Sequence, residues 1–202
     1  MDSFQCLHPR RHKISNIKVI LFDIGGTACK SHQKDTMIDM QRLGTLNRET
    51  AQEMVNPGIF ELLDILKEAG FCLGILSNTS KFKKDLDPVY ISALKMPFSF
   101  SVFSSELEFQ PKKEGDPIRK KPHPDIFHAA YSRAKVFVPD LKYEEVLMVG
   151  NNFKKDFLGA QAVGMKAIWF ECFEPAKMPS EGDIVTSIST MMDLLRYIDM
   201  EE

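Results

Sequence analysis

Three polar side chains that could do chemistry follow directly after apolar runs of this chain. They are Asp23, Ser77 and Asn151, and the pair Gly25 and Gly26 comes soon after the first of them. A carboxylate at the end of a strand, followed by glycines, can act as a nucleophile while backbone N–H groups surround a bound anion. Taken alone, an Asp before glycines also fits an ordinary turn.

The other polar signals have structural alternatives of the same kind. Ser77 and Asn78 could cap the N-terminus of a helix, because their short side chains accept hydrogen bonds from free N–H groups. Lys121, which precedes a proline, could be one more surface lysine. Asn151, with Asp156 five residues later, could form a loop and its cap. Choosing between the functional and the structural interpretation of each residue requires the strands and helices around it.

Short apolar runs alternate with amphipathic stretches along the chain. The runs predict five buried strands, over residues 17–22, 71–76, 98–103, 146–149 and 166–170. Helical spacing of apolar residues predicts helices over residues 58–70 and 154–163, from Pro124 onward, and over 191–198. This alternation predicts an α/β fold, with a Rossmann-like doubly wound parallel sheet and helices on both faces. Because ligands bind at the carboxyl ends of such strands, the three polar side chains are expected to converge there.

Composition places the chain among ordinary globular proteins. Its 202 residues are 44% hydrophobic and 27% charged with a net charge of −2, which predicts one domain over residues 1–202 and does not indicate nucleic-acid binding. The apolar runs are far shorter than the roughly 20 residues that span a bilayer, and no apolar stretch follows the basic start as in a secretory signal, so membrane proteins and secreted disulfide scaffolds are excluded. The four cysteines lie far apart, so no zinc site is expected and reduced thiols indicate a cytoplasmic protein.

The polar signals occur in the order of four motifs, and in this the chain resembles the haloacid dehalogenase superfamily. Residues 23–27 look like its first motif, and Ser77 with Asn78 looks like the second. Residues 121–127 are similar to the third motif and residues 149–164 to the fourth. The resemblance covers residues 17–198, which is nearly the whole chain. It implies the superfamily's Rossmann-like core.

The resemblance also implies a reaction and the residues that carry it. Asp23 would attack the phosphorus atom of a phosphorylated substrate, small or macromolecular, and would become an aspartyl phosphate. Ser77 and the Asn78 amide would bind the phosphoryl oxygens, and Lys121 would offset negative charge. Because carboxylate and phosphate are both anions, a cation beside them lowers the barrier to their approach. The implied function is that of a phosphohydrolase.

Magnesium is the implied cofactor. The resemblance assigns the ion to the Asp23 carboxylate, the backbone carbonyl of Gly25 and the side chain of Asn151, with Asp156 nearby. Ligands that are all oxygens suit magnesium better than zinc.

Two residues depart from the superfamily's pattern. Its phosphatases usually have a second Asp two residues after the nucleophile, which protonates the leaving group and then activates water, whereas this chain has Gly25. Asn151 stands where an Asp normally binds the metal, so weaker magnesium binding is expected. The expected enzyme is therefore weak or favours good leaving groups. The alternative is a catalytically impaired relative that serves as a binding or regulatory module, and a carbon–halogen hydrolase ranks third.

Little chain is left for a lid between the first two motifs. Larger members of the superfamily insert a helical cap of many tens of residues there. In this chain a core helix is expected over residues 58–70, so about residues 28–57 remain for a reduced cap or loop insertion. The site is therefore expected to be open, which suits a bulky substrate or a partner chain that completes the lid.

Overall fold

The computed structural model describes most of the chain. The described residues are 13–30, 33, 36–37, 39–40, 43–78, 94–108, 119–171 and 186–200. The expected insertion, residues 28–57, lies partly outside these ranges. Among the described residues, no helix has the length and the apolar character that a bilayer crossing requires.

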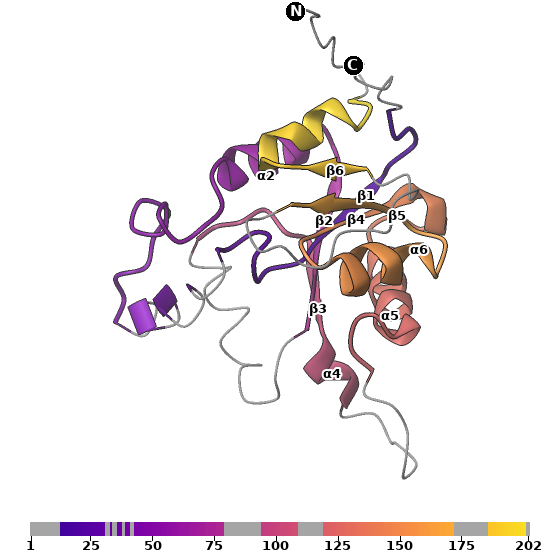
Figure 1. The fold of residues 1–202 in the computed structure, drawn as a ribbon, viewed down its shortest axis with the longest axis horizontal. Helices are drawn as coiled ribbons and strands as arrows, with labels where there is room; N and C mark the ends of the chain where they lie inside the picture. Colours follow the sequence, from indigo (N-terminus) through magenta and orange to yellow (C-terminus); the bar gives the residue numbers. More distant parts are fainter. Residues whose placement is uncertain are drawn as a thin grey trace, which may run out of the picture.

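Six parallel strands form the sheet at the centre of the fold (Figure 1). They are β1 (Val19–Phe22), β2 (Cys72–Ser77), β3 (Phe100–Phe103), β4 (Val146–Gly150), β5 (Lys166–Phe170) and β6 (Ser187–Ile188). Their order in the sheet is β3–β2–β1–β4–β5–β6. From β1 the chain adds β2 and then β3 on one side, and it later adds β4, β5 and β6 on the other side. The direction therefore switches between β1 and β4, and such a switch point opens a crevice at the carboxyl ends of the strands. The predicted doubly wound α/β fold is confirmed.

The strands differ from the prediction at their ends and in their number. β1 and β3 begin two residues later than predicted, and β2 extends to include Ser77. The prediction of five strands is wrong by one, because β6 also pairs with β5 at the edge of the sheet. β6 has two residues, which is too short to produce a recognisable apolar run.

Helices flank the sheet. They are the α-helices α2 (Ile59–Glu68), α4 (Ser104–Glu108), α5 (Pro124–Ala134) and α6 (Gly159–Gln161), the 3₁₀ helices η2 (Tyr143–Glu145) and η4 (Met191–Arg196), and the π-helix η3 (Phe153–Leu158). α5 begins at Pro124 as predicted, because proline suits the first helical position. The helix predicted over residues 154–163 is η3 continued by α6, and the last predicted helix is the 3₁₀ helix η4.

Alternate residues of β1 bury their side chains in two separate cores. Ile20 and Phe22 belong to a cluster with residues of α2 and η4, whereas Val19 and Leu21 belong to a second cluster with residues of α5 and α6. Because successive side chains of a strand point to opposite faces, a strand that is apolar throughout indicates a sheet covered on both sides. Figure 1 shows α2 on one side of the sheet and α5 and α6 on the other.

The described part of the insertion packs onto the core. Met37, Leu46, Ala51 and Val55 are buried in the cluster that contains α2. An antiparallel bridge between Cys29 and Val55 closes the base of the insertion. These residues therefore extend the α2 side of the core.

Arg48 ties the insertion to two other parts of the fold. Its guanidinium group makes a bidentate pair with Asp64 of α2, at 2.7 and 3.0 Å, and donates to the carbonyl oxygens of Leu94 and Lys95, each at 3.0 Å. The hydrogen bonds from Arg48 lower the pKa of the Asp64 carboxyl group, although partial burial opposes this. The pair therefore stabilises the folded state above the ordinary pKa of a carboxyl group, and this contribution is lost as the pH falls through the lowered value.

We expect Arg48→Lys to lower the free energy of unfolding by about 1–2 kcal/mol, because lysine cannot make the bidentate pair and also reach both carbonyls. Urea unfolding of the two proteins measures this difference, which should shrink in acid as Asp64 becomes protonated. Arg196→Lys is the matched control, because the Arg196 side chain, which pairs with Asp193, is more exposed than that of Arg48, and it should cost about 0.5 kcal/mol or less. An equal loss in both variants would contradict the role assigned to Arg48.

Candidate active site

Asp23, Ser77 and Asn151 come together at the carboxyl edge of the sheet. Asp23 follows β1, Ser77 is the last residue of β2, and Asn151 follows β4. β1 pairs with both β2 and β4, so the three positions are neighbours. The backbone N–H of Asp23 donates to the carbonyl oxygen of Val149 at 3.0 Å, which extends the pairing of β1 with β4 up to the site. The convergence predicted from the strand ends is therefore present.

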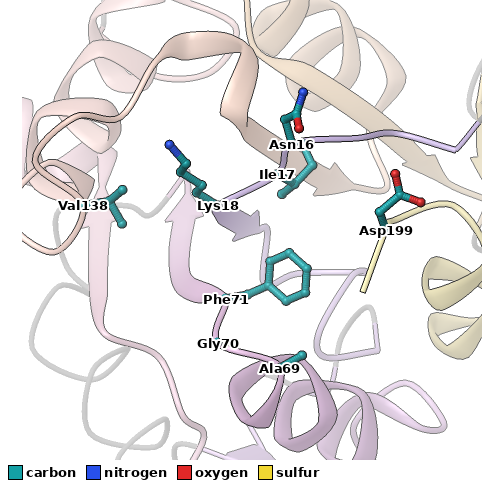
Figure 2. A pocket seen from close by; sticks show the side chains of 8 residues that line it. All are labelled: Asn16, Ile17, Lys18, Ala69, Gly70, Phe71, Val138 and Asp199. Atoms are coloured by element: carbon teal, nitrogen blue, oxygen red, sulfur yellow. The ribbon is translucent and has the colours of Figure 1, made fainter. Parts of the chain in front are cut away.

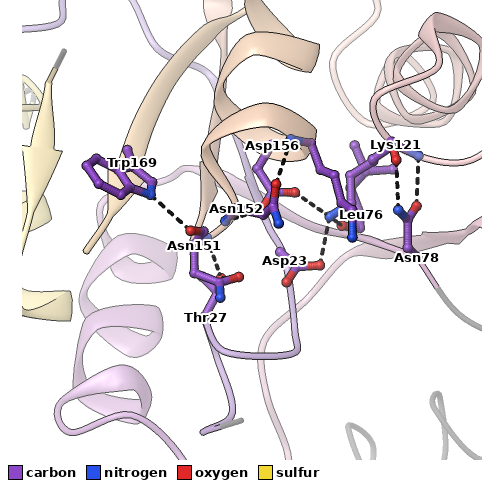
Figure 3. Close-up of polar contacts among 10 residues, drawn as sticks. Asp23, Thr27, Leu76, Asn78, Lys121, Asn151, Asn152, Asp156 and Trp169 are labelled. Atoms are coloured by element: carbon purple, nitrogen blue, oxygen red, sulfur yellow. Dashed lines mark hydrogen bonds and ion pairs between the residues drawn. The ribbon is translucent and has the colours of Figure 1, made fainter. Parts of the chain in front are cut away.

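The ammonium group of Lys121 lies buried at this edge (Figure 3). Its Nζ donates to Oδ1 of Asp23 and to the carbonyl oxygen of Leu76, each at 2.7 Å, and lies 2.7 Å from Oδ1 of Asp156 in an ion pair. Two of its N–H donors therefore have hydrogen-bond acceptors, and the Asp156 carboxylate adds a neighbouring negative charge. Lys121 is 2% exposed, and a cation buried this deeply needs such partners to offset its lost hydration.

The charges around Lys121 determine its protonation. Burial lowers the pKa of Lys121, but Asp156 and Asp23 raise it by more, so the pKa lies above its ordinary value. Burial raises the pKa of Asp156 and the charge of Asp23 adds to this effect, whereas Lys121 opposes it. Lys121 therefore stays protonated and supplies one fixed positive charge beside the Asp23 side chain.

The side chain of Asn78 holds the backbone of Lys121 in place. Its Nδ2 donates to the Lys121 carbonyl oxygen at 2.9 Å, and its Oδ1 accepts from the Lys121 N–H at 2.8 Å. The sequence predicted that the Asn78 amide binds phosphate. Because the side-chain amide is engaged with Lys121, the backbone N–H of Asn78 is the group that remains a candidate for this role.

Asp156 reaches Lys121 because Gly150 has no side chain. A Cβ atom on Gly150 would overlap the side chain of Asp156. Oδ2 of Asp156 accepts from the backbone N–H of Asn152 at 2.9 Å, which fixes the orientation of the carboxylate. Oδ1 is buried and accepts no hydrogen bond of normal geometry among the described residues, so its partner there is the Lys121 charge.

Thr27 connects the loop after β1 to the loop after β4. Its Oγ1 accepts from the backbone N–H of Asn151 at 3.0 Å and donates to Oδ1 of Asn151 at 3.3 Å. The indole N–H of Trp169 donates to the carbonyl oxygen of Asn151 at 2.9 Å. Asn56, from the end of the insertion, donates through Nδ2 to the carbonyl oxygens of Gly26 and Thr27. These contacts fix the orientation of Asn151.

Gly25 leaves an open space two residues after Asp23. It is exposed, and a Cβ atom placed on it would meet nothing within 4 Å beyond its chain neighbours. Its φ is outside the left-handed region, whereas that of Gly26 is 85°. Neither packing nor backbone geometry therefore requires a glycine at position 25.

The oxygens at this edge fit a magnesium ion. Among the described residues, no three His, Cys, Asp or Glu side chains gather into a metal site. The predicted donors are nevertheless all oxygens, from Asp23, Gly25, Asn151 and, nearby, Asp156. The ion pair with Lys121 uses Oδ1 of Asp23 and does not require the second carboxylate oxygen. Because magnesium keeps several waters and needs only one or two carboxylates, this donor set suits it. The set carries less negative charge than one in which a carboxylate replaces the Asn151 amide.

A pocket of about 350 Å³ lies at the opposite edge of the sheet (Figure 2). Its lining includes residues 16–18, which lead into β1, and residues 69–71, which lead into β2. These are the amino ends of the two strands, whereas Asp23 and Ser77 stand at the carboxyl ends. The pocket is therefore separate from the candidate active site.

Residues 33–164, well over half of the chain, match the family model described as haloacid dehalogenase-like hydrolase. The chain belongs to this family. The match begins after Asp23, so the first motif lies outside it. The resemblance inferred from the order of the motifs is confirmed.

Two phosphatases are similar in sequence to this haloacid dehalogenase-like chain. It is 26% identical to the glyceraldehyde 3-phosphate phosphatase of Pyrococcus furiosus, over 89% of this chain and 93% of that protein. It is 32% identical over 150 residues to the protein of the same name from Pyrococcus abyssi, covering 72% of this chain and 55% of that protein. The first alignment spans 237 positions, more than the 202 residues of the chain, so that relative carries segments that this chain lacks.

Solved structures of haloacid dehalogenase-like proteins share the fold. The chain aligns with a HAD phosphatase from Thermococcus onnurineus at a TM-score of 0.59 and 18% identity, over 89% of this chain and 97% of that one. It aligns with a 2-haloacid dehalogenase from Pseudomonas syringae at a TM-score of 0.57 and 17% identity, over 90% and 97%. Because proteins named for different reactions align about equally well, the fold does not by itself select the chemistry.

Several residues that position the haloacid dehalogenase-like site carry no clear signal in the sequence. Thr27 lies inside the first motif, so its place after the glycines could have marked it. Asn56 and Trp169 lie outside the motifs, and their contacts with the site depend on the folded chain. The same holds for the carbonyl oxygen of Leu76, a backbone group that any residue would supply.

We expect Gly150→Ala to lower the free energy of unfolding by about 1–3 kcal/mol, because the added methyl group must displace the Asp156 side chain. Gly25→Ala is the matched control, since its methyl group enters open space, and it should change stability by no more than about 0.5 kcal/mol. Urea unfolding measures both changes. If the two variants were equally stable, Asp156 would not pack against Gly150 as described.

Proposed function

We propose that this protein is a magnesium-dependent phosphohydrolase that acts on small phosphorylated molecules through an aspartyl phosphate on Asp23. The observation that carries the proposal is the 2.7 Å contact between the buried ammonium group of Lys121 and Oδ1 of Asp23. It holds one oxygen of the carboxylate and balances its charge at the edge where the strands converge. The names of the two Pyrococcus relatives support a small phosphorylated substrate.

The reaction would proceed in two steps on Asp23. In the first, a carboxylate oxygen of Asp23 attacks phosphorus while the bond from phosphorus to the leaving group breaks. Lys121 offsets the repulsion between the carboxylate and the phosphate, and Ser77 and the backbone N–H of Asn78 bind the phosphoryl oxygens. In the second, water cleaves the aspartyl phosphate, which releases inorganic phosphate and restores Asp23.

Asp23, the carbonyl oxygen of Gly25 and the side chain of Asn151 would hold the magnesium ion, with Asp156 nearby. When bound, the ion supplies positive charge that stabilises the phosphoryl oxygens in the transition state. Thr27 contributes by holding the Asn151 side chain in one orientation. Because Asn151 is neutral, the binding of the ion is expected to be weak.

The proposed site is open and favours good leaving groups. The described part of the insertion packs on the α2 side of the core, and the Pyrococcus furiosus relative carries segments absent from this chain, which together support a reduced cap. Gly25 has no side chain to protonate a leaving group, so poor leaving groups are expected to react slowly.

We expect Asp23→Asn to reduce phosphatase activity on the order of a thousandfold or more, because it keeps the shape of the side chain but removes the nucleophile. Release of p-nitrophenol from p-nitrophenyl phosphate in the presence of magnesium measures the loss, at a temperature where thermal unfolding shows the variant to be folded. Asp140→Asn, at an exposed aspartate outside the site, is the control and should retain activity. Undiminished hydrolysis by the Asp23 variant would rule out this residue as the nucleophile.

We expect Asn151→Asp to lower the magnesium concentration for half-saturation by about tenfold, because a negative charge within a few Å of the ion adds a screened attraction of about 1 kcal/mol or more. The variant keeps an acceptor for the Thr27 hydroxyl group, so the loop should retain its contacts. Calorimetric titration with magnesium and the magnesium dependence of activity both measure the effect.

Asn152→Asp is the matched control for this experiment. It adds the same charge one residue away, where the side chain accepts from the backbone N–H of Lys155. Its effect on magnesium binding should be clearly smaller. If the two variants changed magnesium binding equally, Asn151 would not be a ligand.

A further inference from the structure

Lys121 cannot exchange a proton with a substrate in this arrangement. Its Nζ donates to Oδ1 of Asp23 and to the carbonyl oxygen of Leu76, and Oδ1 of Asp156 lies 2.7 Å away in an ion pair. Donating a proton to a leaving group would remove the positive charge that compensates the Asp23 and Asp156 carboxylates beside it. Lys121 therefore serves as a fixed charge, without a role as an acid or a base.

Asp156 is the other titratable side chain in contact with Lys121, and it is closed off from the substrate. It is 2% exposed, its Oδ1 faces the Lys121 ammonium group, and its Oδ2 accepts from the Asn152 N–H. The side chain also packs directly over Gly150. A carboxylate held in this way cannot reach a leaving group or a water molecule at the open face of the site.

At the open face itself stands Gly25, which is exposed and has no side chain. Among the described residues, the titratable groups in contact with Asp23 or Lys121 are thus engaged with each other and with backbone groups. The site has a nucleophile and a balancing charge, which are sufficient for transfer of a phosphoryl group. Among those contacts it has no group to protonate an alkoxide or to deprotonate water.

We propose that Asp23 takes its phosphoryl group from acyl phosphates and then holds it as a long-lived aspartyl phosphate. This inference rests on the proposed function, since it requires Asp23 to be the nucleophile. It adds the class of phosphoryl donor and identifies the second step, attack by water, as the slow one.

Transfer from an acyl phosphate needs no proton. A carboxylate oxygen of Asp23 forms the new bond to phosphorus, the bond from phosphorus to the acyl oxygen breaks, and the electron pair leaves with a carboxylate ion. A carboxylate is a stable anion because the pKa of its acid is only about 4. An alcohol, by contrast, leaves as an alkoxide unless it is protonated, and a positioned acid is worth roughly a hundredfold to ten-thousandfold in such a step.

The phosphoryl group then stays on Asp23. An aspartyl phosphate and an acyl phosphate are both mixed anhydrides of a carboxylic acid and phosphoric acid, so exchange between them is close to thermoneutral and reversible. Removal by water requires a base that takes a proton as oxygen attacks phosphorus, and both Lys121 and Asp156 are engaged. Hydrolysis is therefore slower than phosphorylation.

The test uses acetyl phosphate with the full-length protein and magnesium. Intact-mass spectrometry follows the phosphorylated protein while acetate release is measured. We expect a burst of about one acetate per protein, followed by release at least about tenfold slower, as is typical of an accumulating covalent intermediate. Asp23→Asn should show neither the burst nor the gain in mass.

Two substitutions at position 25 distinguish the effect of an acid–base group from the effect of side-chain volume. Gly25→Asp adds an ionisable group in the open space, whereas Gly25→Asn adds nearly the same volume without one. We expect Gly25→Asp to accelerate steady-state acetate release by roughly a hundredfold or more and to abolish the accumulation. Gly25→Asn should not accelerate it. Thermal unfolding checks that both variants fold, and the wild-type measurement decides the question even if one does not.

The outcomes distinguish this inference from the proposed function. Rapid, linear acetate release by the wild-type protein without a phosphorylated form would overturn the inference and leave the phosphohydrolase standing. So would hydrolysis of a sugar phosphate as fast as that of acetyl phosphate, because another group would then supply the proton. If neither acetyl phosphate nor p-nitrophenyl phosphate yields inorganic phosphate or phosphorylated protein, both proposals fail.

Discussion

The contact of one buried ammonium group with two carboxylates is the constraint on which the rest of the site depends. Lys121 is nearly inaccessible to water, so Asp23, Asp156 and the carbonyl oxygen of Leu76 must replace its hydration. Removing either carboxylate would leave a buried charge only partly compensated, a change that is strongly destabilising. The loops after three different strands therefore have to meet at one point. The same contact places a positive charge beside Asp23, at the edge where the strands converge.

The main lines of the fold and the convergence of the site could be predicted because they follow from local patterns. A strand that is apolar throughout, such as β1, indicates a sheet covered on both faces, and Asp23 directly after it is then placed at the carboxyl edge. β6 could not be predicted, because two residues make no pattern. The π-helical turn of η3 could not be predicted either, since apolar spacing does not distinguish it from an ordinary helix.

Contacts between residues far apart in the chain could not be predicted from a single sequence. Asn78 looked like a phosphate ligand or a helix cap, but its side chain holds the backbone of Lys121, which lies 43 positions further along the chain. Thr27 meets Asn151 across 124 positions, and nothing in the types of these residues specifies that pairing. Candidate site residues could thus be predicted from their types and their places at strand ends. The residues that hold them in position could be identified only from the structure.

The order of the strands has a consequence for the protein during its synthesis. β1 is synthesised well before β4, yet Val19 pairs with Val146, and Asp23 meets Lys121 across 98 positions. Until β4 and η3 have been made, β1 lacks one of its two neighbours, and Asp23 is an ordinary carboxylate on an incomplete sheet. A nascent chain of this protein therefore carries Asp23 without the Lys121 charge beside it until residue 121 has been made. Such long-range pairing of parallel strands also makes folding slow relative to proteins built from local contacts.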